Sequence, residues 1–489
     1  MTINDSPGQR YVPLLCWMIV LLAAGLICLK LLSFGFIPPG DARRHAAKPF
    51  AHKPYSEIVV MRPEYVVDHS PGWEWLLGTV QRATNCDIDT LICFSLVTTL
   101  LAVLCLPLFW VRRPEAWLAA IMAQSVAYPH LMGRWAQARP FLLTEGILMA
   151  LLFSWSRQEE RPVPWWKIGA TTAGFTLSVW MHGAWYLWIL LPAAFALARR
   201  WRAALWLTVC WVAGTILGAC LTGKPVAFLN GAVFMARTIF QEAVPKWMLV
   251  GEFQPSTGEF MALTVLAVVY LWLRPVNTGC RALTRQPVFW MMLITWTLGL
   301  SADRFWADLG VAAATVWLAM QFDEAMPGLW KSSACLRLAG CGIIAASLYL
   351  ISTNDAGRSY TSYQTEEFLD GSVPELKGWM PGSGGIFYSD NMTFFYNTFY
   401  KNPRADWRYI LGFEPALMPE EDLKVYRNIQ RHNHAADTYG PWVKKMRPQD
   451  RLAVDSFTLP DMPELEWKRT TGDLWIGRPR AAAGTSRRP

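Results

Sequence analysis

The sequence predicts a polytopic α-helical membrane protein with about eleven transmembrane helices and a small C-terminal extracytoplasmic α/β or α+β domain. Three observations support this fold class. Of the 489 residues, 53% are apolar and only 17% are charged, and tryptophan occurs 27 times, which is typical of membrane proteins. Apolar stretches recur until about residue 352, after which the hydropathy falls. Lysine and arginine are concentrated in every second connection between the apolar stretches.

Eleven stretches are apolar enough to predict transmembrane helices, because a span needs about 20 mostly apolar residues. Residues 90–110 meet this condition without a charge, and residues 11–36 meet it with Lys30 alone near the outer end. The first stretch is too long for a cleaved signal peptide. The other predicted spans, several of them short, are 116–132, 140–155, 168–181, 185–197, 203–221, 260–273, 287–300, 309–322 and 338–351.

The charged connections predict the orientation of the chain, because short loops rich in lysine and arginine stay cytoplasmic. The basic residues of these connections are Arg112, Arg113, Arg157, Arg161, Lys167, Arg199, Arg200, Arg202, Arg274, Arg281, Arg285, Lys331 and Arg337. An odd number of spans then places the N-terminus in the cytoplasm and the C-terminus outside. These loops and an arginine-rich tail account for most of the net charge of +8. We therefore expect a membrane partner and no nucleic acid.

The hydropathy divides the chain into two predicted domains. Residues 1–352 form the membrane domain, which includes two long outer loops at 35–89 and 222–259. Residues 353–489 are polar enough and numerous enough to form one small independent domain outside the membrane.

The C-terminal domain should contain both strands and helices. Residues 384–388, 452–454 and 473–476 have the composition of strands, and 419–431 has helical spacing with acidic residues in its first turn. The aromatic segment 394–400 is either part of a hydrophobic core or seam, or a platform on which a sugar stacks.

The motif that most clearly suggests catalysis follows the first span: Pro38-Pro39-Gly40-Asp41-Ala42-Arg43-Arg44-His45. A carboxylate at the outer interface could take the proton of an acceptor hydroxyl while a lipid-linked donor lies in the membrane. The same carboxylate could instead cap a helix that begins at Ala42. His45 shares its face one turn later. It could orient Asp41, contact a phosphate, or be a plain interfacial histidine.

In this motif and in its whole layout, the chain resembles the GT-C glycosyltransferase superfamily. Members of that superfamily keep an essential acidic residue in the first extracytoplasmic loop, often within a pair of acids. The resemblance implies a GT-C-like fold, Asp41 as catalytic base and a polyprenyl-phosphate sugar as donor. It also makes a divalent cation such as Mg²⁺ or Mn²⁺ conceivable. However, Gly40 stands where many relatives have a second acid, so no paired-acid motif supports a cofactor.

Arginines in outer loops are exceptions to the charge rule and invite a functional explanation. Arg139 could bind phosphate through its planar fork of donors, or it could pair with Glu145 in the next span. The resemblance implies that Arg304 binds the phosphate of the donor, because GT-C enzymes often place a basic residue in a late outer loop. Asp303 and Asp308 are then expected to orient Arg304.

Three further residues complete the candidate substrate-binding set. His69 could lie near Asp41, since both belong to the first outer loop. His182, at a tight turn between two spans, could contact substrate or be a histidine of the interfacial belt. Glu242 lies in the second long outer loop, as does Glu252. We expect no protein-bound metal from the cysteines and histidines, since none has the spacing of a metal site.

Together these observations predict a multi-pass enzyme of the bacterial inner membrane. It would be an inverting glycosyltransferase that moves a hexose or pentose from a polyprenyl-phosphate donor to a lipid or glycan acceptor at the outer face, with Asp41 as general base. The main alternative is a lipid or glycan transporter or flippase, which would need charged residues at mid-span near broken helices. Such charges are scarce here. A non-catalytic scaffold is a third alternative.

Overall fold

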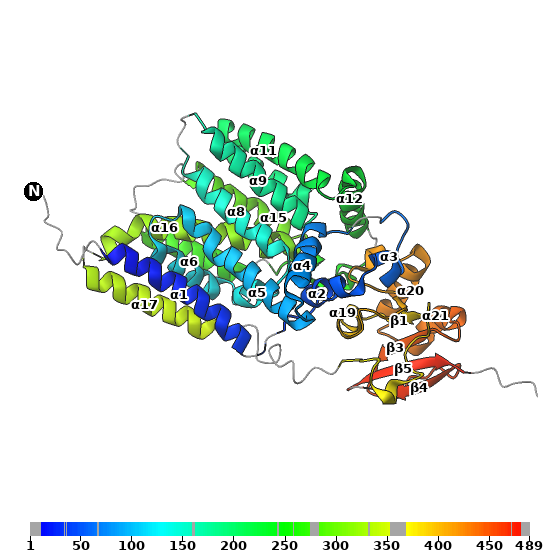
Figure 1. Cartoon of the computed structure of the whole chain (residues 1–489). Helices are drawn as coiled ribbons and strands as arrows, with labels where there is room; N and C mark the ends of the chain where they lie inside the picture. The colour runs from blue at the N-terminus through cyan, green and yellow to red at the C-terminus, as the bar shows by residue number, and fades with distance from the viewer. Residues whose placement is uncertain are drawn as a thin grey trace, which may run out of the picture. The chain divides into compact units, whose positions relative to one another are not determined.

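The chain divides into two compact units, which we describe separately (Figure 1). The computed structural model describes residues 11–33, 35, 37–65, 68–158, 162–241, 244–257, 259–273, 283–330, 333–352, 368–470 and 472–480. The first unit, here called the helical unit, comprises Met1–Ile37, Cys93–Pro225 and Leu249–Ser362. The second, here called the sheet unit, comprises Pro38–Ile92, Val226–Met248 and Tyr363–Pro489.

Helices account for nearly all of the regular structure that is described in the helical unit. In chain order they are α1 (Val12–Ser33), α5 (Ile88–Cys105), η2 (Leu106–Trp110), α6 (Pro114–Ala127), α7 (Leu131–Trp135), α8 (Phe141–Ser156), α9 (Trp165–Met181), η3 (Trp185–Ile189), α10 (Leu190–Leu197), α11 (Trp201–Cys220), η5 (Gly251–Phe253), α13 (Phe260–Leu273), α15 (Pro287–Gly299), η6 (Phe305–Gly310), α16 (Val311–Trp330) and α17 (Ala334–Ile351). Each of the predicted spans coincides with helix.

Several of these helices have the length and apolar composition needed to cross a membrane. Within the described part of the chain, five helical stretches do so: Val12–Ser33, Ile88–Trp110, Trp201–Cys220, Phe305–Met326 and Ala334–Ile351. Shorter apolar helices are Phe141–Ser156, Trp185–Leu197, Phe260–Trp272 and Pro287–Gly299. The prediction of a helical membrane protein is therefore confirmed, whereas the count of about eleven spans stays a prediction.

Glycine allows helices α9 and α11 of the helical unit to pack closely. Helices α9 and α11 pack along their lengths, as Figure 1 shows. A Cβ atom on Gly214 would lie 2.5 Å from the Cβ of Phe175, and one on Gly218 would lie 2.8 Å from the carbonyl oxygen of Thr176. Small residues at such crossings let two backbones approach, which is the usual basis of helix association in membranes.

Two buried carboxylates in the helical unit, Glu115 and Asp323, are paired with arginines. Glu115 is fully buried in α6 and accepts a hydrogen bond from Nε of Arg337, which lies 2.6 Å from Glu115 Oε1. Asp323 is also buried and pairs with Arg157 at 2.5 Å. These arginines belong to the connections that the charge pattern predicts to be cytoplasmic, so the pairs hold that end of the bundle together.

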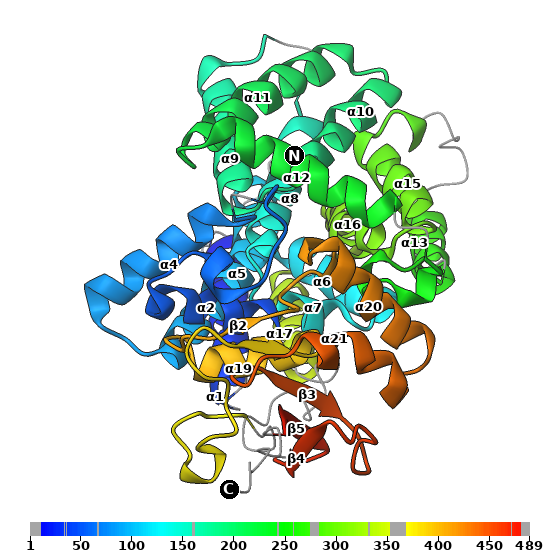
Figure 2. The same cartoon turned by 90° about the vertical axis from the view of Figure 1, so that its right-hand side faces the viewer.

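The sheet unit is built around a mixed five-stranded sheet. Its strands are β1 (Ile386–Tyr388), β2 (Arg408–Tyr409), β3 (Arg451–Asp455), β4 (Leu465–Arg469) and β5 (Leu474–Pro479), in the order β2-β1-β3-β5-β4. β1 pairs in parallel with β2 and β3, whereas β5 runs antiparallel to β3 and β4. Figure 2 shows β3, β5 and β4 side by side.

Helices from three regions of the sequence complete the sheet unit. They are α2 (Asp41–Ala51), α3 (Tyr55–Ile58), α4 (Pro71–Thr84), α12 (Pro225–Gln241), η4 (Lys246–Met248), η8 (Pro374–Leu376), α19 (Met392–Lys401), η9 (Pro415–Leu417), α20 (Glu420–Arg431), η10 (Ala436–Tyr439) and α21 (Gly440–Lys445). The predicted strands near 384–388, 452–454 and 473–476 and the predicted helix at 419–431 are all present. The expectation of a C-terminal region with both helices and strands is confirmed.

The aromatic segment 394–400 lies within α19 and supplies the core of the sheet unit. Phe395 and Phe399 are buried, and their rings stack with centroids 5.6 Å apart. Phe395 also packs edge-to-face on Tyr409 of β2. The hydrophobic-core interpretation of this segment is therefore confirmed.

The segment 38–92 contributes to the same core. Tyr55, Ile58 and Val59 are buried in one cluster with Phe387 and Tyr409. Val59 also forms a parallel bridge with Tyr409, so the backbone after α3 adds to the edge of the sheet. Residues 38–92 thus fold with the C-terminal sheet, and this arrangement fixes the position of α2.

Candidate functional site

Asp41 is the first residue of α2 and faces polar groups of the sheet unit. The N-cap of α2 is Gly40, whose φ of 73° favours glycine, so Asp41 is not the capping residue. Its Oδ1 lies 3.3 Å from Nε of Arg44, and the hydroxyl of Tyr396 lies 3.4 Å from the same oxygen. The Asp41 side chain is 28% exposed, so the carboxylate can be reached by another molecule.

Arg44 holds a positive charge beside Asp41. It is buried, with its Cζ 4.0 Å from the ring centre of Phe413, and its Nη1 lies 3.2 Å from the hydroxyl of Tyr55. The same Nη1 lies 3.7 Å from Oδ1 of Asp68. A guanidinium fixed by an aromatic ring, a hydroxyl and a second acid has little freedom, so it fixes the orientation of the Asp41 carboxylate.

His45 supports Arg44 as a neutral side chain. It is buried, and its Nε2 lies 2.9 Å from Nη2 of Arg44. Burial and the Arg44 guanidinium lower the pKa of His45 to about 3. Because the guanidinium can only donate, Nε2 must accept, and the proton of the neutral ring lies on Nδ1. His45 therefore supports Arg44, which in turn contacts Asp41.

Two further acids lie behind Arg44. Burial and the neighbouring Glu74 raise the pKa of Asp68 to about 6, although Arg44 opposes the shift. Oε1 of Glu74 lies 3.8 Å from Nδ1 of His45. His69 follows Asp68 directly and is half-buried just before α4. The segment 38–92 thus supplies a compact group of acids and bases around Arg44.

A second polar group lies in the helical unit, which we call the arginine cluster: Arg134, Arg139, Arg304, Glu252 and Asp308. Arg139 pairs with Oε1 of Glu252, and Nη1 of Arg304 lies 3.8 Å from Oε2 of the same side chain. Nη2 of Arg134 lies 3.9 Å from Oε1 of Glu252. Asp308 accepts from Nε of Arg134 at 2.9 Å and from Nε of Arg304 at 3.1 Å. Three arginines thus share two carboxylates.

Local backbone structure brings Arg304 and Asp308 together. Arg304 precedes the π-helix η6, in which Asp308 lies four residues later, so both side chains lie on one face. The widened turn needs Gly310, because a Cβ atom there would lie 2.3 Å from the ring of Trp306. Such π-helical turns occur frequently at functional sites.

The electrostatics of the cluster keep Glu252 ionised. Burial alone would raise the pKa of Glu252, but Arg139, Arg304 and Arg134 outweigh it and lower the pKa to about 2. Asp303 lies next to the cluster, and burial raises the pKa of its carboxyl group. The arginine cluster is therefore a partly buried group in which ion pairs hold the positive guanidinium groups and the negative carboxylates in place.

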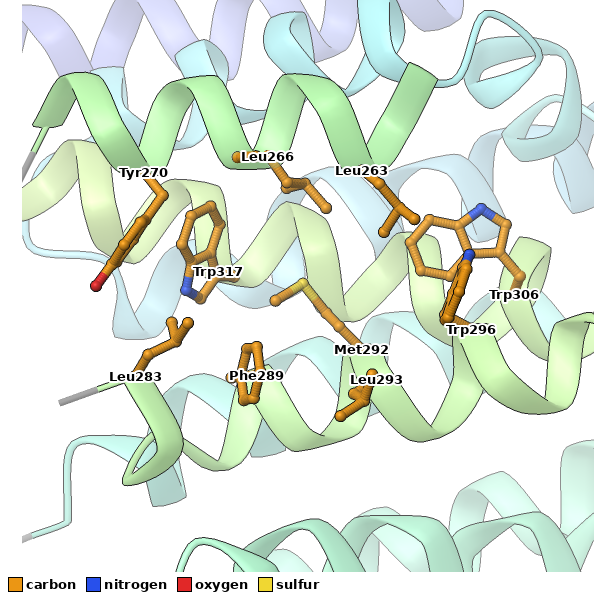
Figure 3. Close-up of a pocket in the computed structure, with 11 residues that line it drawn as sticks. Leu263, Leu266, Tyr270, Leu283, Phe289, Met292, Leu293, Trp296, Trp306 and Trp317 are labelled. Carbon is orange, nitrogen blue, oxygen red and sulfur yellow. The ribbon is translucent and has the colours of Figure 1, made fainter. Parts of the chain in front are cut away.

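An apolar cavity of about 270 Å³ lies in the same unit, between α13, α15 and α16 (Figure 3). Its lining includes Tyr270, Trp296, Trp306 and Trp317 together with leucines and a methionine. Trp306 lies between Arg304 and Asp308 in the sequence. The wall of the cavity and the arginine cluster are thus formed in part by the same short segment.

Comparisons with known proteins identify the fold. No protein-family model and no curated protein sequence matches the chain. The structure is similar to that of ArnT from Cupriavidus metallidurans bound to undecaprenyl phosphate, with a TM-score of 0.54 and 12% identity over 94% of this chain and 97% of ArnT. The chain has the GT-C fold. A second GT-C structure, the Archaeoglobus fulgidus oligosaccharyltransferase tethered to an acceptor peptide, matches with a TM-score of 0.53 and 11% identity over 90% of this chain and 69% of that one. The same archaeal enzyme, AglB, matches in complex with an inhibitory peptide and a dolichol-phosphate, with a TM-score of 0.50 and 11% identity.

The remaining residues that the sequence suggested, His182, Glu145 and Glu242, differ in where they lie. His182 is buried at the end of α9, and its ring packs edge-to-face on Phe141, with centroids 5.0 Å apart. The Phe141 ring centre lies 5.6 Å from the Cζ of Arg304, so His182 lies behind the arginine cluster. Glu145, proposed as a partner of Arg139, accepts a hydrogen bond from the indole of Trp135 at 2.8 Å. Glu242 lies outside the described residues.

The surroundings of Asp41 do not suit the divalent cation that the GT-C resemblance made conceivable. Its nearest groups include the Arg44 guanidinium, which would repel a metal ion. Among the residues that the structure describes, no group of three or more histidines, cysteines, aspartates or glutamates could hold a metal.

Three residues of the two polar groups, Arg44, Arg134 and Glu252, were assigned no role or only a minor one from the sequence. Arg44 lies three residues after Asp41, and helical spacing alone would have pointed to it. Arg134 shares its outer loop with Arg139, so the same exception to the charge rule marks it. Glu252 was only a minor candidate, because its contacts come from segments more than 50 residues away.

Proposed function

We propose that this chain is an inverting glycosyltransferase that moves a hexose or pentose from a polyprenyl-phosphate donor to a lipid or glycan acceptor. The reaction would take place at the outer face of a bacterial inner membrane. The observation that carries the proposal is the arginine cluster of the helical unit, which shares the segment around Trp306 with an apolar cavity. Guanidinium groups suit a phosphate, and the cavity suits a hydrocarbon chain. The undecaprenyl phosphate in ArnT and the dolichol-phosphate in AglB support a donor of this class.

In this proposal, Arg304 and Arg139 bind the phosphate of the donor, and Asp308 orients Arg304. As the anomeric carbon parts from the phosphate oxygen, negative charge grows on the leaving group. Fixed guanidinium groups stabilise that charge without reorganising. His182 supports the same region through Phe141.

Asp41 acts as the general base. Its carboxylate takes the proton of an acceptor hydroxyl while the hydroxyl oxygen attacks the anomeric carbon, and the polyprenyl phosphate leaves from the opposite side. Arg44 positions Asp41, and His45 holds Arg44 in place. His69, in the same loop, and Glu242 are assigned to substrate binding. A single displacement of this kind inverts the anomeric centre.

The orientation of the chain gives a direct test of where the reaction would occur. Reporter fusions after Arg200 and after Asn354 should report opposite sides of the membrane, with the first cytoplasmic and the second outside. The measurement is the activity of paired reporters that work on only one side. The same side for both fusions would contradict the assignment of Asp41 and Arg304 to the outer face.

The enzyme and the transporter alternative differ in what happens to the donor. Purified protein in proteoliposomes would be given a series of polyprenyl-phosphate sugars and an extract of envelope lipids and glycans. We expect sugar on an acceptor and an equal amount of free polyprenyl phosphate. A donor that changes leaflet but is never cleaved would support a transporter and contradict the proposal.

A further inference from the structure

One carboxylate lies in the middle of the arginine cluster. Oε1 of Glu252 contacts Arg139 and lies 3.9 Å from Arg134, while its Oε2 lies 3.8 Å from Arg304. Arginine forks bind carboxylate and phosphate oxygens in the same geometry. The Glu252 carboxylate therefore lies where three guanidinium groups converge.

We infer that Glu252 is a resident counter-anion of the donor site, which weakens the binding of a doubly charged phosphate and so promotes release of the polyprenyl-phosphate product. This inference rests on the proposed function of the arginine cluster. It gives Glu252 a role in turnover that differs from those of Arg304 and Asp308.

The backbone keeps Glu252 at the cluster. Its segment is tied to the loop before η6 by two hydrogen bonds, from the Asp303 amide to the Gln254 carbonyl at 2.7 Å and from the Ser256 amide to the Gly299 carbonyl at 2.9 Å. The amide side chain of Gln254 also donates to the carbonyl of Leu249 at 2.9 Å. The backbone thus keeps the charge of Glu252 beside the arginines.

The charge of the cluster suits a singly charged phosphate better than a doubly charged one. Its three arginines and two carboxylates leave one positive charge among the ion-paired groups. The phosphodiester of the donor carries one negative charge. Transfer converts it to a phosphate monoester, whose second pKa of about 6 makes it a dianion at neutral pH. Glu252 therefore repels the product more strongly than the donor.

The test compares the binding of two lipids that differ by one methyl ester and hence by one negative charge. Wild type, Glu252→Gln, Glu252→Asp and Glu259→Gln would be placed in phosphatidylcholine nanodiscs and titrated at pH 8 with polyprenyl phosphate and with its methyl phosphodiester. We expect Glu252→Gln to bind polyprenyl phosphate more tightly by a factor on the order of tenfold, since a nearby like charge is removed. The gain for the phosphodiester should be smaller.

The two other variants separate a local charge effect from a structural one. Glu252→Asp keeps the charge and should bind both lipids like wild type. Glu259→Gln removes the same charge from the same outer segment and should also behave like wild type. Its carboxyl group lies near Asp303 and His130, whose charges act on it, rather than at the centre of the three arginines.

Each outcome decides the inference. If wild type binds polyprenyl phosphate but Glu252→Gln binds it equally or more weakly, Glu252 only organises the arginines, and the inference fails while the proposed function stands. Equal tightening in Glu259→Gln would reduce the effect to net charge and also overturn the inference. If wild type and Glu252→Gln bind neither lipid, both the inference and the proposed donor site are wrong.

Discussion

Replacing Asp41 by asparagine should reduce sugar transfer by at least about a hundredfold, while the protein stays folded and in the membrane. The amide has the shape of the carboxylate and can still accept from Tyr396 and Arg44, so α2 should keep its place. It cannot take a proton at neutral pH, so the acceptor hydroxyl would have to attack without a base. The measurement is the initial rate of transfer in proteoliposomes.

Asp87→Asn is a matched control for this substitution. Asp87 lies in the same stretch of the sheet unit, and its Oδ1 accepts a hydrogen bond from the amide of Thr90 at 2.9 Å. Asparagine serves equally well in such a helix-capping position. We expect near wild-type turnover from Asp87→Asn. Near wild-type turnover from the Asp41 variant as well would leave Asp41 with a structural role only.

Replacing Arg304 by alanine should cost about 2–4 kcal/mol in transition-state stabilisation, the range found when a group that stabilises developing negative charge is removed. The loss would combine weaker donor binding with an unstabilised leaving phosphate. Arg304→Lys should lose less, because it keeps the charge but not the planar fork. The measurement is kcat/KM for the polyprenyl-phosphate sugar, with melting of the purified variants to confirm that they fold.

Arg337→Lys controls for the loss of an arginine–carboxylate pair as such. Arg337 pairs with the buried Glu115 in the same unit, but in a connection that is predicted to be cytoplasmic. Its replacement by lysine should change stability more than kcat/KM. If kcat/KM of Arg304→Ala were as high as kcat/KM of Arg337→Lys, the arginine cluster would have no part in catalysis.

Features that depend on local sequence could be predicted. The helices follow the apolar stretches, because an apolar segment of sufficient length has to satisfy its backbone hydrogen bonds internally when it crosses a membrane. The helix α20 follows from the periodicity of its apolar residues, and the strand β3 follows from its short apolar run. Asp41 could be selected as a candidate because its place directly after the first apolar stretch is visible without any tertiary contact, and its role as base stays a prediction.

Features that depend on distant segments could not be predicted. Tyr55 and Val59 join a core with Tyr409, about 350 residues later, and nothing in either segment specifies that partner. The aromatic segment 394–400 had two open interpretations for the same reason. Glu252 could be placed with Arg139 and Arg304 only from the structure, because these two arginines come from distant segments and lie beside the same carboxylate.

The anomeric configuration of the transferred sugar tests the central claim most directly, because the claim is a single displacement at the anomeric carbon with Asp41 as base. The donor would be a polyprenyl-phosphate sugar of known configuration that supports transfer, and the product would be analysed by NMR spectroscopy before any spontaneous change. The account predicts a product of opposite configuration, formed only by protein that retains Asp41. Retention of configuration would exclude a single inverting displacement and would contradict the account.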